Sequence, residues 1–161
     1  DFLCTSMDRA KKAVEMGAGV LQPVATQHTQ VARPGIDRLR ANVIEAAEQC
    51  GILAVPEVRE TVKLDRLLAD WENGRRLIFC DEDADTNNPI SKLADIGEKK
   101  LGLLVGPEGG FSMDEVRFLD VLGFRPAHLG PTVLRTETAA LYAVAAIQVI
   151  LRERSSWTPT A

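Results

Sequence analysis

Two glycine-rich loops are the stretches of this sequence most able to do chemistry. The first, residues 106–110, follows the apolar run 101–105 and contains three glycines and a proline within five residues. The second, residues 130–136, follows the short segment 126–129 and opens with Gly130-Pro131. Glycine permits positive φ and close approach of the backbone to a ligand, so such loops can read a ligand through N–H and carbonyl groups. A tight turn between a strand and a helix is the alternative explanation.

Three charged residues in these loops are the candidates for catalysis. Arg135 carries fixed donors that can steer or stabilise an anionic group, with a salt bridge to Glu108 or Glu137 as the structural alternative. Glu108 lies in the glycine turn, where its carboxylate can face a ligand or accept from local amides. Glu137 falls in the first turn of the next helix, where a carboxylate also favours the helix dipole.

Other nucleotide and metal motifs do not fit. The first loop has no lysine in the position that a P-loop requires, and its spacing is not that of a dinucleotide-binding fingerprint. His28 and His128 are the only histidines and have no metal-ligand spacing, so we predict no metal. His28, in a polar loop, is a weak candidate for RNA contact. The acidic segment 81–85 is expected to be a solvated loop.

The hydrophobic pattern alternates between helix and strand, which indicates an α/β fold with a mostly parallel sheet. In such sheets ligands bind beyond the carboxyl ends of the strands, where both loops should lie. The last helix is apolar almost all round, which predicts burial against the sheet and a partner subunit. Ser112 and Glu115 form a capping-box pattern, and Thr136 or Thr138 is expected to cap the last helix. Helices are expected at 7–16, 36–49, 64–71, 90–96, 113–122 and from 136 or 138 to about 154, and strands at 19–24, 53–58, 76–80, 101–105 and 126–129.

Composition is that of an ordinary globular domain. The 161 residues are 45% hydrophobic and 26% charged, so we expect one domain at 1–154 and a loose tail at 155–161. The three cysteines are widely spaced and are expected to be reduced thiols of a cytoplasmic protein. The net charge of −4 gives no basic footprint for nucleic acid at the level of the whole chain. A local cluster could contact phosphate or form solvated helix faces: Lys11, Lys12, Arg33, Arg38 and Arg40.

Four motifs together resemble the ribosomal RNA small subunit methyltransferase E family. They are GPEGGFS at 106–112, LGPTVLRTETA at 129–139, KAVEMG at 12–17 and EAAEQCG at 45–51. The resemblance implies the SPOUT class, whose C-terminal region forms a trefoil knot that holds S-adenosylmethionine. The chain departs from the family at residues 27–29, which read Gln-His-Thr in place of Glu-Arg-Ser, and at Ile52, where the family has Arg.

The resemblance also implies an activity. It is methylation of N3 of a uridine in 16S ribosomal RNA, acting on the RNA or the small ribosomal subunit, by a homodimer with no membrane association. A SPOUT enzyme with another target, such as a 2′-oxygen, and a non-catalytic cofactor- or RNA-binding module remain alternatives. We expect this chain to be the methyltransferase domain without the family's N-terminal PUA-like domain. The positions that carry over as cofactor-binding are Val105, Gly106, Gly109, Gly110, Leu129, Gly130, Val133, Leu134, Thr136, Thr138 and Ala139.

Overall fold

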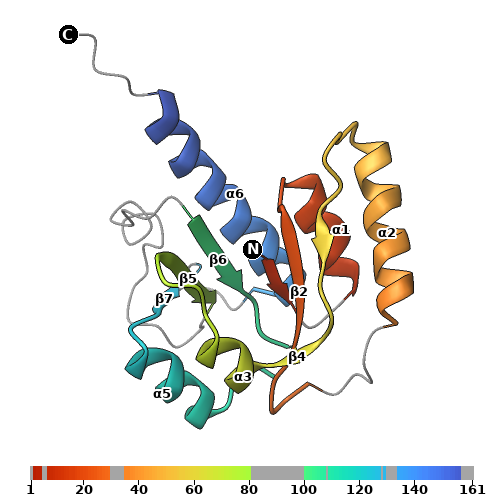
Figure 1. Cartoon of the computed structure of the whole chain (residues 1–161). Helices are drawn as coiled ribbons and strands as arrows, with labels where there is room; N and C mark the ends of the chain where they lie inside the picture. The colour runs from red at the N-terminus through yellow and green to blue at the C-terminus, as the bar shows by residue number, and fades with distance from the viewer. Residues whose placement is uncertain are drawn as a thin grey trace, which may run out of the picture.

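A parallel sheet forms the centre of the protein (Figure 1). The structure is a computed structural model that describes residues 2–4, 7–29, 35–80, 100–107, 109–127, 129 and 134–156. The strands follow the order β3-β2-β1-β6-β5-β7, with β4 paired to β2, and each of these pairs is parallel. The strands are β1 (Phe2–Cys4), β2 (Val20–Ala25), β3 (Glu57–Val58), β4 (Val62–Lys63), β5 (Arg75–Cys80), β6 (Lys100–Leu104) and β7 (Arg125–Ala127). The α/β fold with a mostly parallel sheet is therefore confirmed for the described residues.

Helices cover both faces of this sheet. One layer consists of α1, α2 and α6, and the other consists of α3 and α5 (Figure 1). The side chains of successive strand residues point to opposite faces, so each strand contributes to both layers. The helices are α1 (Met7–Glu15), α2 (Ile36–Gln49), α3 (Leu64–Ala69), α5 (Met113–Val121) and α6 (Thr136–Ser156).

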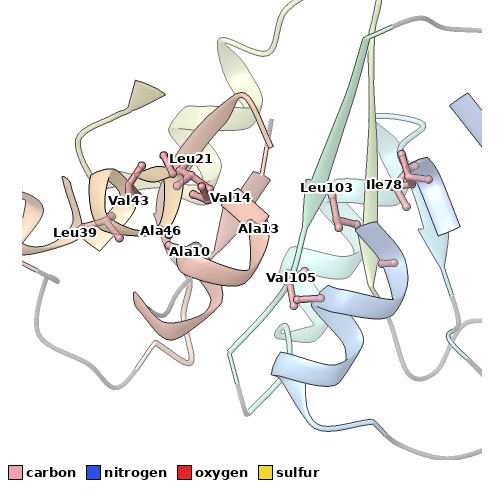
Figure 2. Close-up of a cluster of buried hydrophobic side chains, with 14 residues drawn as sticks. Ala10, Ala13, Val14, Leu21, Leu39, Val43, Ala46, Ile78, Leu103 and Val105 are labelled. Carbon is pink, nitrogen blue, oxygen red and sulfur yellow. The ribbon is translucent and has the colours of Figure 1, made fainter. Parts of the chain in front are cut away.

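The central strands show this alternation directly. Ile78, Leu103 and Val105 join the hydrophobic core that packs under α1, α2 and α6 (Figure 2). Their neighbours Leu77 and Leu104 point the other way, into the core under α3 and α5. Because both faces of β5 and β6 are buried, these strands read as continuous apolar runs in the sequence.

The core under α3 and α5 is built around aromatic rings. The rings of Trp71 and Phe124 pack edge to face, with their centroids 6.2 Å apart. The rings of Phe79 and Phe111 pack in the same way at the same centroid distance. Gly102 of β6 makes room for this packing, because a Cβ there would lie 2.6 Å from the Trp71 ring. Phe111 and Phe124 flank α5, so these ring contacts hold both ends of the helix to this core.

The last helix differs from the prediction in its cap and in its end. The amide of Ala139 donates to the carbonyl of Arg135 at 2.9 Å, so Arg135 is the N-cap and the expectation of Thr136 or Thr138 was wrong. The helix also continues to Ser156, beyond the expected end near 154. Between residues 139 and 150 most side chains are buried or half-buried, as expected. Tyr142 is 42% exposed and Val149 56% exposed, and these two form the exposed stripe of this stretch.

Two strands, β1 and β4, were missed and one was predicted too long. The sheet begins with β1, which lies between β2 and β6, whereas the prediction began with a helix. Three residues show no period, so the hydrophobic pattern gave no signal for β1. The predicted strand 53–58 shrinks to β3, and Leu53 is fully exposed. The predicted acidic loop and helix within 81–96 lie outside the described residues.

Two further expectations can be compared with the described residues. Cys50 and Cys80 are reduced, which agrees with the thiols expected at these two positions. Within the described part of the chain, no helix combines the length and the apolar character needed to cross a bilayer.

Candidate functional site

The first glycine loop leaves the carboxyl end of β6 and turns tightly. Val105, Gly106 and Pro107 are buried, and the amide of Gly110 donates to the carbonyl of Pro107 at 2.9 Å. Gly110 has a φ of +66°, which favours glycine. A Cβ on Gly106 would lie 3.0 Å from the ring of Phe111. The first residues of this loop are therefore held close to the core, and the recognition of a ligand through its backbone stays a prediction.

The start of α5 is fixed by the predicted capping box. The Ser112 hydroxyl accepts from the amide of Glu115 at 3.3 Å, and the Glu115 carboxylate accepts from the amide of Ser112 at 2.9 Å. The other carboxylate oxygen of Glu115 accepts from the amide of Gln27 at 2.8 Å. Glu115 thus joins α5 to the loop after β2, a connection that the capping pattern alone did not predict.

The loop after β2 also reaches the first glycine loop. Residues 26–29 form a turn in which the amide of Thr26 donates to the Thr29 hydroxyl at 2.9 Å. His28 Nδ1 lies 3.0 Å from the carbonyl oxygen of Gly109. Because a carbonyl only accepts, Nδ1 carries the proton in this bond and Nε2 faces away from it. The departure at 28 therefore lies against the first glycine loop, and the departure at 27 lies against the start of α5.

The second loop is described only in part. Leu129 packs against the core that contains Val105, Ala139 is 8% exposed and Leu134 is half-buried, whereas Arg135 and Thr138 are exposed. This places the start of α6 near the carboxyl end of β6 (Figure 2). Three of the predicted residues lie outside the described part of the chain: Glu108, Gly130 and Val133. Two others, Thr136 and Glu137, have a described backbone but no described side chain.

The geometry of the predicted catalytic set is thus not tested. Among the described side chains, Arg135 has no ion-pair partner. The side chains of its two expected partners, Glu108 and Glu137, are not described. The exposed position of Arg135 at the N-cap of α6 leaves its guanidinium accessible to a ligand. The three residues remain a prediction.

The candidate basic patch is largely paired with carboxylates. Lys11 lies 2.9 Å from Glu45, and Arg40 lies 2.9 Å from Glu60. Lys12 bonds its own helix neighbour Glu15 at 2.9 Å. These contacts favour the solvated helix face over a phosphate-binding patch. Arg33 and His128 lie outside the described residues.

A cavity that the sequence did not predict lies beside these loops. It has a volume of about 440 Å³ and opens where β2 and β4 end and α5 begins. Its lining combines apolar, cationic and acidic side chains that come from segments far apart in the sequence. The lining residues are Ala25, Thr26, Gln27, Lys63, Leu64, Asp65, Ser112, Asp114, Glu115 and Phe118. Among the described residues, no group of three or more potential ligands is arranged for a metal ion.

Comparison with known proteins identifies the family. Residues 6–148 match the model of the RNA methyltransferase domain. The chain belongs to this family. The ribosomal RNA small subunit methyltransferase E of Rickettsia conorii is 29% identical over 86% of this chain and 57% of its own length. The protein of the same name from Bacillus subtilis is 30% identical over 85% of this chain and 58% of its own length.

Solved structures of RNA methyltransferase relatives share the fold. The ribosomal RNA small subunit methyltransferase E of Neisseria gonorrhoeae, bound to S-adenosyl methionine, superposes with a TM-score of 0.81 at 30% identity. This match covers 92% of the chain and 65% of that protein. A Legionella pneumophila protein in complex with the cofactor SAM gives a TM-score of 0.76 at 31% identity. The resemblance drawn from the motifs is confirmed, and the chain spans between half and two thirds of the length of these relatives.

Proposed function

We propose that this domain transfers the methyl group of S-adenosylmethionine to N3 of a uridine in 16S ribosomal RNA. The observation that carries the proposal is the pair of loops at 106–110 and 129–139, in a chain that belongs to the RNA methyltransferase domain family. Relatives named for small subunit rRNA methylation match along most of the chain, and two solved relatives hold the cofactor. The choice of N3 follows from the resemblance to that family.

The residues present fit this cofactor. Gly109 is exposed at the turn of the first loop, and the half-buried Leu129 and Leu134 of the second loop supply apolar surface for a planar ring. When bound, S-adenosylmethionine supplies an activated methyl group. Its adenine can be recognised by backbone N–H and carbonyl groups of the two loops, which require the close approach that glycine permits.

The protein must also prepare the uridine. Methylation at N3 requires loss of the N3 proton, which leaves negative charge on the uracil ring. The guanidinium of Arg135, exposed at the N-cap of α6, can stabilise that charge. Glu108, Glu137 or a water molecule can accept the proton. Holding the uracil in line with the methyl group is the main contribution expected of the protein.

The assembly expected of SPOUT enzymes is part of the proposal. Tyr142 and Val149 are the exposed large hydrophobic side chains of α6 among the described residues, which supports a homodimer. The chain passes from α5 on one face of the sheet, through the edge strand β7, to α6 on the other face. This path is compatible with a C-terminal trefoil knot. We place the protein in the cytoplasm, where ribosomal subunits are its substrate.

The test is methyl transfer with mapping of the modified atom. Small ribosomal subunits and free 16S rRNA that lack the modification would be incubated with the protein and labelled S-adenosylmethionine. Mass spectrometry of the isolated nucleoside should find 3-methyluridine. Methylation at a 2′-oxygen would identify a SPOUT enzyme with another target. Cofactor binding without transfer, in the longest natural form of the protein, would identify a non-catalytic binding module.

A further inference from the structure

The cavity between β2, β4 and α5 shares no residue with the predicted cofactor-binding set. Its lining comes from the loop after β2, from the start of α3 and from the first turns of α5. It lies next to the cofactor loops all the same, because Gln27 in its wall precedes His28, which contacts Gly109. A ligand in this cavity would therefore sit beside the bound cofactor without competing for its loops.

The apolar part of the lining suits a planar ring. Phe118 is 40% exposed, so part of its ring is open, while Leu64 and Ala25 form apolar wall. Proteins that recognise unpaired RNA bases stack them on aromatic side chains and read their edges by hydrogen bonds. A volume of about 440 Å³ can hold a single nucleobase with part of its sugar.

The charges of the lining select for hydrogen-bond donors. One cation, Lys63, faces three carboxylates, Asp65, Asp114 and Glu115. The Glu115 oxygens already accept from two backbone amides, and Asp65 accepts from the amide of Arg66 at 2.7 Å. The Asp114 carboxylate makes no hydrogen bond to another described residue. A ligand that offers N–H groups would satisfy these acceptors, whereas an anion would be repelled by the carboxylate excess.

We infer that this cavity binds one unpaired nucleobase with an exocyclic amino group, adjacent in the RNA to the methylated uridine. The inference rests on the proposed function for the identity of the polymer. Adenine, cytosine and guanine each bring an amino group that a carboxylate accepts, as aspartate does from cytosine N4. Uracil has no amino group. The cavity is therefore expected to prefer a different base from the uracil that is methylated. Lys63 is exposed and is the one cation of the lining, so it offsets part of the repulsion between the carboxylates and the RNA backbone.

The experiment compares matched RNA pentamers. Pentauridine and its variants with a central adenosine, cytidine or guanosine would be titrated into the labelled protein saturated with S-adenosylmethionine. Backbone NMR signals of Gln27, Asp114 and Phe118 should shift, and the amino-bearing pentamers should bind about tenfold more tightly than pentauridine. Equal affinity for pentauridine, no binding of any pentamer, or shifts confined to other residues would overturn the inference.

Paired variants on one helix separate base binding from helix stability. Phe118→Ala should weaken the preferred pentamer about tenfold through loss of stacking, whereas Val121→Ala, outside the cavity, should not. Asp114→Asn should reduce the preference over pentauridine, and Asp120→Asn should leave it intact. Equal effects within either pair would contradict the inference. The affinity for S-adenosylmethionine is measured separately and tests the proposed function. A failure of the proposed function can therefore be told apart from a failure of base selection.

Discussion

His28 Nδ1 lies 3.0 Å from the carbonyl oxygen of Gly109, although the two residues are 81 positions apart in the chain. The bond ties the loop after β2 to the glycine loop after β6. A Cβ on Gly109 would lie 3.4 Å from His28 Cβ, so the two loops are in van der Waals contact as well. Residue 28 is a position where the chain departs from the resembling family. The structure shows that its side chain holds the glycine loop, and we predict that this contact positions the loop for the cofactor.

Replacing His28 by alanine should weaken S-adenosylmethionine binding. The first glycine loop would lose one hydrogen bond, and a net hydrogen bond is worth about 0.5–1.5 kcal/mol, which corresponds to roughly two- to tenfold in affinity. The change is measured by calorimetric titration. Arg38→Ala, an exposed substitution on α2, is the control. An unchanged affinity in His28→Ala would show that this bond does not position the loop.

Removing the Glu115 carboxylate should cost more stability than removing the Ser112 hydroxyl. Ser112→Ala loses one cap interaction, with an expected cost of about 1 kcal/mol. Glu115→Ala frees two backbone amides, those of Ser112 and Gln27, and should cost about 2 kcal/mol or more. Urea unfolding followed by circular dichroism measures both. Equal losses would mean that the bond to Gln27 contributes nothing to the fold.

The two adjacent glycines of the first loop should differ in their tolerance of alanine. Gly110 has a φ of +66°, so Gly110→Ala should lower the free energy of unfolding by about 1–2 kcal/mol. Gly109 does not have a positive φ, and a Cβ there meets His28 only at van der Waals distance, so Gly109→Ala should fold with little loss. Thermal unfolding of the two variants provides the comparison. A larger loss at Gly109 than at Gly110 would contradict the loop geometry.

Glu72 should make folding stability depend on pH in the acid range. Hydrogen bonds from Lys100 and then Arg75 hold the pKa of the Glu72 carboxyl below its usual value. A lowered folded-state pKa stabilises the protein above the unfolded pKa of about 4.3, and this contribution is lost as pH falls through the folded value. Glu72→Gln should therefore be less stable than wild type at pH 7, and the difference should close in acid.

The control for this prediction is another exposed glutamate. Glu48 on α2 is exposed, and its side chain forms no ion pair with another described residue. Glu48→Gln should follow the stability of the wild type across the same pH range, measured by urea unfolding at each pH. A constant difference between Glu72→Gln and wild type from pH 7 down to pH 3 would rule out the ion pair as its cause.

The parts of the fold that the sequence predicted are those set by local chemistry. Helix α2 begins and ends at the predicted residues because Leu39, Val43, Ala46 and Ala47 recur at helical spacing and are buried. The cap at Ser112 was predicted because its partner lies three residues away. Both features depend on contacts within one turn or one helix face, which a pattern along the chain can reveal.

The parts that were missed depend on distant partners. Strand β1 has three residues, and its place between β2 and β6 comes from long-range pairing. The cavity brings Lys63 and Asp114 together from different elements, and His28 meets Gly109 only after the sheet has formed. None of these has a local signature. The sequence could at most show that residue 28 departs from a family pattern, and that departure was the one available signal.

The central claim is that the loops at 106–110 and 129–139 hold S-adenosylmethionine. The most direct measurement is calorimetric titration of the protein with this cofactor, beside Leu134→Arg and the matched control Leu53→Arg at a fully exposed position. Light scattering on the same samples gives the oligomeric state. Saturable binding near one per subunit in wild type and Leu53→Arg, lost in Leu134→Arg, is the predicted result. Absence of binding by a well-folded wild-type dimer would contradict the claim.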